Sequence, residues 1–498
     1  MTAPHVQNPY AGASRARKRR IVWAVVIAVL AIGGAVTYVK FFREEPAPYF
    51  ASEEDHFLFG SVGTEAEQGI PYWIWLVLPR VFPEHLPGPG GYASLGILSR
   101  DGHEMPIGLS KVTIGFPRVA INCAMCHTAR VRTQPKALAM IVPAAPSHQT
   151  APQMYLRFLF ACASDPRFTA DTILAEIARN HRLSFLDRIL YRFVIIPGTR
   201  RALLRLKEQD AWMQRNPDWG RGRIDPFNPV KFGILKQPVD ATIGNSDMVP
   251  LWNLKAHRGY SLHWDGLNAN LQEVVLSSAL GDGATRKWVD RDFAKWNNAG
   301  PTEMSSLRRV QNYISTVQPP PYPFPIDRAL ADSGKAVYQR ECGSCHAPGG
   351  ERTGKVIPLD EIGTDGHRLA MWTPASPVAY NAYGEGHPWK FTGFTKTNGY
   401  VSVPLEGLWL RAPYLHNGSV PSLTDMLELP ERRTAVFWRG YDVYDPVKVG
   451  FVSTGSEAEQ AGTRYDVSQR GNSNAGHLYG TGLPAEEKRA LIEYLKTL

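Results

Sequence analysis

A chain of 498 residues is too long for one ordinary core, so we expect two or more domains. Its 44 glycines and 39 prolines predict many turns and loops. The net charge of +9 gathers at the N-terminus: residues 1–43 hold seven lysines and arginines and no acid, which leaves 48 basic and 46 acidic residues elsewhere. No Lys/Arg-rich run stands out in this nearly neutral body, which argues against nucleic-acid binding.

The first predicted element is a membrane-spanning helix over residues 21–39. These residues carry no charge and, at about 1.5 Å each, match a hydrocarbon layer about 30 Å thick. The stronger basic cluster, Arg15 to Arg20, comes first, which predicts a cytoplasmic N-terminus and an exported body. A cleaved signal peptide is the alternative, but no clear Ala-x-Ala site follows. We favour an uncleaved anchor in the inner (cytoplasmic) membrane, with the body on the periplasmic side.

A Cys-x-x-Cys-His motif occurs twice, in INCAMCHTAR (121–130) and in ECGSCHAPGG (341–350). The motif residues are Cys123, Cys126 and His127 in the first copy and Cys342, Cys345 and His346 in the second. Even one copy arises by chance in only about one chain in a thousand of this size. Two copies are therefore a strong signal.

Haem c explains every residue of both motifs: the thiols form thioethers with the vinyl groups, and the imidazole is the proximal iron ligand. A zinc site needs four ligands gathered locally, whereas 215 residues separate these pairs. A thioredoxin-type disulfide needs neither histidine, and no βαβ pattern surrounds either pair. We therefore predict two covalently bound haems c. The fifth cysteine, Cys162, lies in an apolar run and is expected to be an inert buried thiol.

The chain between and after the motifs predicts helices and one linker. Residues 150–235 are expected to be largely helical and to cover the first haem. Apolar residues recur at helical spacing before the Pro-rich VQPPPYPFPID (317–327) and again at the C-terminus. The proline run predicts a stiff linker. The predicted division is 1–43 (basic N-terminus and anchor), 44–317 (N-terminal haem c domain with a helical insertion), 318–325 (linker) and 326–498 (C-terminal haem c domain).

The second axial ligand of the C-terminal haem has three candidates. His477 lies in the glycine-rich GNSNAGHLYGTGL, ahead of the last predicted helix, and is favoured. Met426 and Met371 are the thioether alternatives, although methionine is more often core filler than ligand.

Longer motifs carry a family resemblance. LHWDGLNANLQEVV (262–275) and RAPYLHNGSVPSL (411–423) resemble paired motifs of the bacterial di-haem cytochrome c peroxidase/MauG superfamily. GSVGTEAEQGIPYWIWLVLPRVFPE, YDPVKVGFVSTG and GNSNAGHLYGTGL are most similar to its rubber-oxygenase-like branch. The resemblance spans nearly everything after about residue 50.

The resemblance implies roles for single residues. The N-terminal haem would be reactive and the C-terminal haem would store electrons, with Trp264 as the relay between them. Trp264 as an ordinary core residue is the alternative. His477 matches the second axial ligand of the C-terminal haem, and His416 matches a histidine that supports haem packing and is not a ligand. The superfamily also holds calcium between its domains, but no clear ligand set is visible here, so calcium stays open.

Departures from the peroxidase pattern concern the distal side of the first haem. Val274 and Ala284 stand where the peroxidases have Gln and an acidic Glu, and the distal histidine falls near Ala241. Peroxide heterolysis needs a group that moves a proton, for which Glu273 and Asp282 are the remaining candidates.

An apolar distal pocket, expected from Val274, Ala279 and Leu280, would suit an uncharged substrate and dioxygen. The rubber oxygenases carry a bulky aromatic near this place and this chain does not, which puts polyisoprene itself in doubt.

The sequence therefore predicts a mainly α, loop-rich fold with two cytochrome c-like haem domains, long irregular insertions and one N-terminal transmembrane helix. The leading function is oxygenase-like oxidation of an apolar substrate, with an unsaturated compound as one candidate, at the haem held by His127. The alternatives are a peroxidase served by a small periplasmic electron-transfer protein, and a plain electron-transfer cytochrome. The long first half argues against the plain carrier, which needs far less protein per haem.

Overall fold

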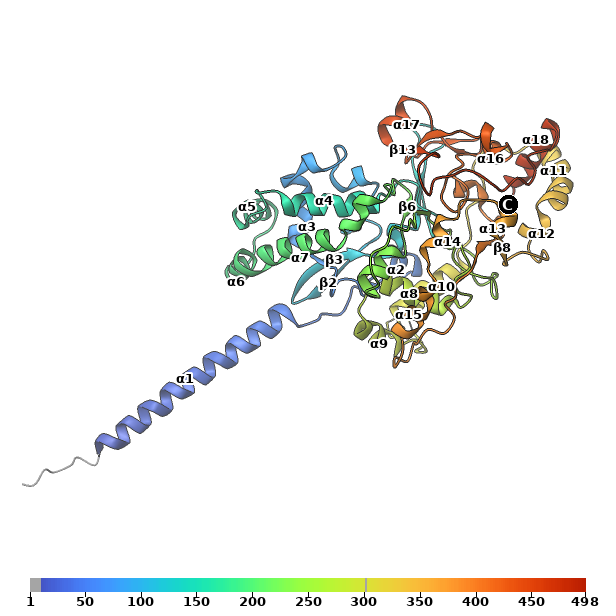
Figure 1. Ribbon diagram of the computed structural model, residues 1–498. Helices are drawn as coiled ribbons and strands as arrows, with labels where there is room; N and C mark the ends of the chain where they lie inside the picture. Colours follow the sequence, from blue (N-terminus) through green and yellow to red (C-terminus); the bar gives the residue numbers. More distant parts are fainter. Residues whose placement is uncertain (1–9, 301) are drawn as a thin grey trace, which may run out of the picture.

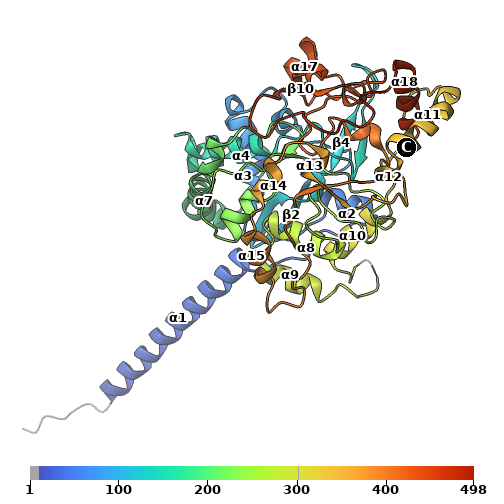
Figure 2. The same ribbon diagram turned by 45° about the vertical axis from the view of Figure 1, so that its right-hand side comes forward.

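The computed structural model describes residues 10–300 and 302–498. Its most prominent feature is the long helix α1 (Tyr10–Phe41), which stands away from the body in both views (Figures 1 and 2). It runs beyond the predicted span of 21–39 because its flanks are rich in alanine, arginine and lysine, which favour helices. Within it, Arg17–Phe41 is long and apolar enough to cross a bilayer, with a mean hydropathy of 2.3 in its most apolar stretch, and none of that stretch is buried against the body.

The part from residue 44 to Thr316 is helix-rich, with short antiparallel strands. Its helices are α2 (Glu53–Phe59), α3 (Tyr72–Val81), α4 (Pro152–Ser164), α5 (Ala170–Asn180), α6 (Phe185–Leu190), the π-helical turn η4 (Tyr191–Ile195), α7 (Ile196–Gln209), α8 (Leu271–Gly281), α9 (Arg286–Phe293) and α10 (Ser306–Thr316). Strands β1 (Ile70–Pro71), β3 (Phe116–Ile121) and β2 (Leu109–Ile114) form a sheet in that order, while β4 (Thr128–Val131) pairs with β5 (Met140–Pro143) and β6 (Arg223–Ile224) with β7 (Ser246–Asp247).

The part after the proline run contains short helices and two-stranded sheets. Its helices are α11 (Arg328–Glu341), α12 (Gly343–His346), α13 (Leu359–Ile362), α14 (His367–Met371), α15 (Ala375–Tyr383), α16 (Leu423–Met426), α17 (Ser456–Ala461) and α18 (Ala485–Leu495). Its strand pairs are β8 (Val356–Pro358) with β9 (Gly399–Val401), β10 (Val436–Arg439) with β13 (Thr463–Asp466), and β11 (Tyr444–Asp445) with β12 (Gly450–Phe451). The helices expected just before the linker and at the C-terminus are confirmed as α10 and α18.

Two apolar cores hold the body together, and each draws side chains from both sides of the proline run. The larger core unites α2, α3, α4, α8 and α10 with Trp372 and Tyr380 from the C-terminal half. The second unites α11 and α18 with Val131 and Trp252 from the N-terminal half. The Pro-rich segment itself forms neither helix nor strand, and its Tyr322 packs on the second core. The two halves are therefore joined by shared cores as well as by the chain.

Candidate functional site

One cavity of about 1190 Å³ is bordered by both Cys-x-x-Cys-His motifs. Every predicted site residue lines it: Cys123, Cys126, His127, Trp264, Cys342, Cys345, His346 and His477. These residues lie up to 354 positions apart in the sequence, and the fold brings them around a single space.

Asn122 builds the turn that carries the first motif. It caps the short 3₁₀ helix Cys123–Met125, because its Oδ1 accepts a hydrogen bond from Ala124 N at 3.0 Å. Its Nδ2 donates to the carbonyls of Leu58 and Gly60 at 3.3 and 2.9 Å, which ties the turn to the end of α2. Sequence reasoning missed this residue, although an asparagine before a short helix is a recognisable cap.

The second motif begins where α11 ends. The Cys342 N–H donates to Tyr338 O at 2.8 Å, and α12 then presents His346. The position of α11 is set by α18, against which it packs closely at Gly334. A Cβ on Gly334 would collide with the carbonyl oxygen of Ala490, so the close crossing requires glycine there.

Backbone carbonyls orient both motif imidazoles. His127 Nδ1 lies 2.9 Å from Val249 O, and His346 Nδ1 lies 2.7 Å from Val403 O. An Nδ1–H that donates to a carbonyl leaves Nε2 with its lone pair free, which is the arrangement found in metal-binding histidines. Burial lowers the pKa of His127 to about 4 and also lowers that of His346, so both rings are neutral near pH 7. Both rings therefore fit the role of axial haem ligands.

His477 faces His346 across the cavity. The two ring centroids are 6.2 Å apart. A metal binds an imidazole nitrogen at about 2 Å, so rings on opposite sides of one metal have centres roughly 6 Å apart. Burial lowers the pKa of His477 to about 3, with His346 adding to the effect, and its Nδ1 has no hydrogen-bond partner among the described residues. The pair fits a six-coordinate haem.

Arg433 holds the loop that carries His477. Its buried guanidinium donates to the carbonyls of Asn474, Gly476 and His477 at 2.5, 3.0 and 3.2 Å. His477 itself adopts a φ of 46°, a left-handed conformation that costs energy in a non-glycine residue. Arg433 therefore compensates this strain, and no sequence motif identifies it.

The remaining methionine candidates differ in position. Met426 borders the cavity, whereas Met371 is fully buried in the apolar core and does not line the cavity. The geometry therefore favours His477 over either methionine.

No second ring stands opposite His127 as His477 stands opposite His346. Among the described residues, no aromatic or imidazole ring lies at a comparable distance from it.

Burial raises the pKa of Cys123 to about 12 and that of Cys126 further, with Asp282 adding to both, so the thiols are neutral. Neutral buried sulfur suits a thioether bond better than a metal–thiolate bond, which needs a deprotonated thiol.

Trp264 is fixed from both halves of the chain. Its indole Nε1–H donates to Asp247 O at 2.7 Å, and its own carbonyl accepts from Val401 N at 2.9 Å. Asp247 in turn is paired with buried Arg439 at 2.9 Å. This arrangement holds an aromatic ring rigidly on the cavity wall.

The wall near the first motif is mostly apolar, and the predicted set of apolar lining residues is confirmed in part. Val274 and Leu280 line the cavity, but Ala279 is buried in the core behind it. Glu273 also does not line the cavity; its carboxylate accepts hydrogen bonds from Asn268 and from residues 392 and 393, which removes it as a distal group. Asp282 does line the cavity, and burial raises its pKa to about 7.

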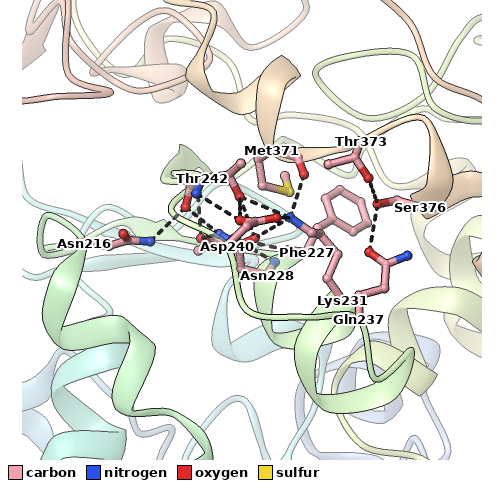
Figure 3. A network of polar contacts seen from close by, with 12 residues as sticks. Asn216, Phe227, Asn228, Lys231, Gln237, Asp240, Thr242, Met371, Thr373 and Ser376 are labelled. Carbon is pink, nitrogen blue, oxygen red and sulfur yellow. Dashed lines mark hydrogen bonds and ion pairs between the residues drawn. The ribbon is translucent and has the colours of Figure 1, made fainter.

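A buried lysine fixes another part of this wall (Figure 3). Lys231 lies in a π-helical turn (Val230–Ile234), and its Nζ is 2.7 Å from Asp240 Oδ2 and 3.1 Å from both Asn228 Oδ1 and Thr242 Oγ1. The same ammonium donates to the Met371 carbonyl at 2.9 Å. A fully satisfied buried cation of this kind locks the turn to the C-terminal half.

His416 is buried in the cavity wall and stacks on Tyr400, with ring centroids 3.9 Å apart and Nε2 3.0 Å from the phenol oxygen. These contacts fit a packing role.

The cluster Glu84, His85 and Asp165 is grouped closely enough for a metal, but Arg167 pairs with both carboxylates, and the cluster does not border the cavity. Calcium binding stays a prediction.

A model of the RoxA-like, cytochrome c-like family matches residues 399–439. This stretch contains β9, the Val403 carbonyl that orients His346, and Arg433, and it marks the protein as a haem-binding cytochrome related to the RoxA-like group.

The chain has relatives in Sinorhizobium fredii (strain NBRC 101917 / NGR234). It is 30% identical to the uncharacterized protein y4iJ over 475 residues, which cover 76% of this chain and 77% of y4iJ. It is 31% identical to the uncharacterized protein y4iM over 235 residues, which cover 38% of this chain and 53% of y4iM. The chain belongs to the family of y4iJ.

Proposed function

We propose that this protein is a di-haem c-type oxidoreductase that oxidises an apolar, unsaturated substrate with dioxygen at the N-terminal haem. The observation that carries the proposal is the asymmetry between the two motifs: His346 is faced by His477, whereas His127 has no such partner among the described residues. A haem with an open axial position supplies binding and reduction of dioxygen or peroxide, and a six-coordinate haem supplies electron transfer.

The chain's own residues prepare this chemistry. Cys123 and Cys126 would hold the first haem and Cys342 and Cys345 the second, with His127 and His346 oriented by backbone carbonyls. Val274 and Leu280 exclude water and hold an apolar substrate by contact. Trp264, held rigidly on the wall, would carry electrons between the two sites.

The second candidate is a peroxidase, and Asp282 is the observation that favours it. A carboxyl group on the cavity wall with a pKa of about 7 can hold and release a proton near neutral pH, as peroxide cleavage requires.

One experiment separates these functions in the haem-loaded full chain. Oxygen uptake is measured with a dispersed long-chain alkene and no peroxide, and peroxide consumption is measured with a reduced small cytochrome as electron donor. We expect alkene-dependent oxygen uptake that Asp282→Asn lowers less than tenfold. Peroxide consumption that falls a hundredfold or more in Asp282→Asn would favour the peroxidase. Neither activity would indicate a plain electron carrier.

We also propose that α1 stays uncleaved and anchors the protein in the inner membrane, with the haem sites on the periplasmic side. The support is the length and apolar composition of Arg17–Phe41 and the basic residues that precede its apolar part.

A further inference from the structure

A helical segment of the body presents an apolar face to solvent. Along α6 and η4, five apolar side chains share one side of the helix and are exposed to solvent. They are Phe185, Leu186, Ile189, Phe193 and Val194, with 82%, 38%, 38%, 70% and 46% of their surface exposed. We call this set the α6 face. Contiguous exposed apolar side chains of this size mark an interaction site.

The end of α1 is fixed to the body close to this face. The Gly115 N–H at the tip of the β2–β3 hairpin donates to Arg43 O at 2.7 Å, and Phe41 packs edge-on against Phe116 at 6.5 Å. Gly115 has a φ of 72°, and a Cβ there would collide with the Lys40 carbonyl. The hairpin tip therefore fits against the last turn of α1.

An ion pair connects α1 directly to α6. Lys40 Nζ lies 2.6 Å from Asp187 Oδ1, and both side chains are partly buried. Asp187 directly follows Leu186 in the sequence, so one member of the α6 face is adjacent to the residue that contacts the end of the apolar helix. The end of α1 lies beneath this helical part of the body in Figure 1.

The surroundings of the α6 face are strongly basic. Residues 179–207 contain eight arginines and lysines and one acid, Asp187. The sequence analysis found no Lys/Arg-rich run in the body. It missed this segment because the basic residues are spread over α5, α6, η4 and α7. An apolar helical face flanked by arginines is typical of helices that lie in a membrane interface with anionic headgroups.

We propose that the α6 face is a second membrane contact, which inserts into the periplasmic leaflet of the bilayer that α1 spans. The proposal rests on the proposed anchor, because α1 and its ion pair place the face at the bilayer surface. It also narrows the substrate of the proposed function to apolar compounds that dissolve in the bilayer. Helix α7 continues directly from η4 and supplies Leu203 and Leu206 to the cavity wall. An apolar compound dissolved in the bilayer therefore meets the protein beside the helix that borders the site.

The test uses the full haem-loaded chain in vesicles of phosphatidylcholine and phosphatidylglycerol that contain a phospholipid with a diazirine in its acyl chain. After illumination, labelled peptides are mapped by mass spectrometry. We expect label on α1 and on residues 185–194, and none at Leu138 or Val447, which are exposed apolar side chains in loops elsewhere. The double variant Phe185→Ser/Phe193→Ser changes only exposed side chains and should lower the label at 185–194 at least fivefold while α1 keeps its label.

Two different failures can be told apart. Label on α1 with residues 185–194 at the level of Leu138 would overturn the second contact and leave the anchor standing. No label on α1 would overturn the anchor and, with it, this inference.

Discussion

Two backbone carbonyls and one buried arginine, rather than the motif residues alone, determine how the candidate haem ligands are presented. His127 and His346 each depend on one backbone carbonyl, and His477 depends on a loop whose carbonyls converge on Arg433. The guanidinium suits this task because it presents five N–H donors in a rigid plane.

Arg433→Lys should loosen the His477 loop. A lysine ammonium cannot reach the same carbonyls together, so we expect stability to fall by about 2 to 4 kcal/mol, the range for lost buried charged hydrogen bonds. Urea unfolding followed by absorbance of the haems measures this. Arg432→Lys is the matched control, because Arg432 is the exposed neighbour and its change should stay within about 0.5 kcal/mol. Equal effects of the two substitutions would contradict the role of Arg433.

His56 should make stability depend on pH. It joins α2 to α10, with Nε2 2.9 Å from Ser306 Oγ, and burial lowers its pKa to about 4, with Arg309 lowering it further against the hydrogen bond to Ser306. The unfolded value is about 6.5. Between these two pKa values His56 is protonated in the unfolded chain and neutral in the folded chain. The contribution is therefore complete above pH 6.5 and is lost as the pH falls toward 4.

This loss amounts to at most about 3 kcal/mol, at 1.36 kcal/mol for each pKa unit. Urea unfolding at pH 7 and pH 4.5 should show a smaller pH effect in His56→Gln than in the parent chain. An identical pH effect in both would show that His56 does not carry this dependence.

The residues that could be predicted are those whose chemistry is local in sequence. Cys-x-x-Cys-His is visible because five adjacent positions define it, and His477 stood out in its glycine-rich loop. Asn122 was also local, as a cap, and was missed. Arg433 and the carbonyls of Val249 and Val403 lie tens to more than a hundred positions from the histidines that they contact. No sequence spacing therefore predicts these contacts.

At the scale of elements, amphipathic periodicity was sufficient for α10 and α18, because each buries one face against a core. Strands of two residues, such as β6 and β11, are too short to show any alternation. The α6 face was missed for a different reason. The sequence alone does not show whether another part of the protein covers an apolar run, so such a run is taken for buried core.

The crossing of α11 and α18 gives a prediction at this scale. Gly334→Ala should force the two helices apart and destabilise the protein by about 2 to 3 kcal/mol, the usual cost of overpacking. Because α11 leads directly into the second motif, the absorbance of the C-terminal haem should also change. Ser333→Ala, the exposed neighbour on the same helix, is the control for urea unfolding. A Gly334→Ala protein as stable as its Ser333→Ala counterpart would contradict the close crossing.

At the scale of the whole molecule, the two halves share more than the sequence indicated. The division at the proline run stays a prediction, but both apolar cores and the cavity are built from residues on each side of it. Sequence periodicity cannot show this, because it reports which face of an element is buried and not which distant element covers it.

The shared cavity borders one site with two facing imidazoles, and a second site where no ring of the described residues faces His127. This asymmetry is the basis of the proposed division between an electron-transfer haem and a reactive haem.

The most direct test is the low-temperature EPR spectrum, with its optical counterpart, of the haem-loaded full chain and its His477→Ala variant. We predict one low-spin and one high-spin haem in the parent chain, and loss of the low-spin signal in His477→Ala. His416→Gln, which changes another buried histidine of the cavity wall, should keep that signal. Two low-spin haems in the parent chain, or a low-spin signal that survives His477→Ala, would contradict the account.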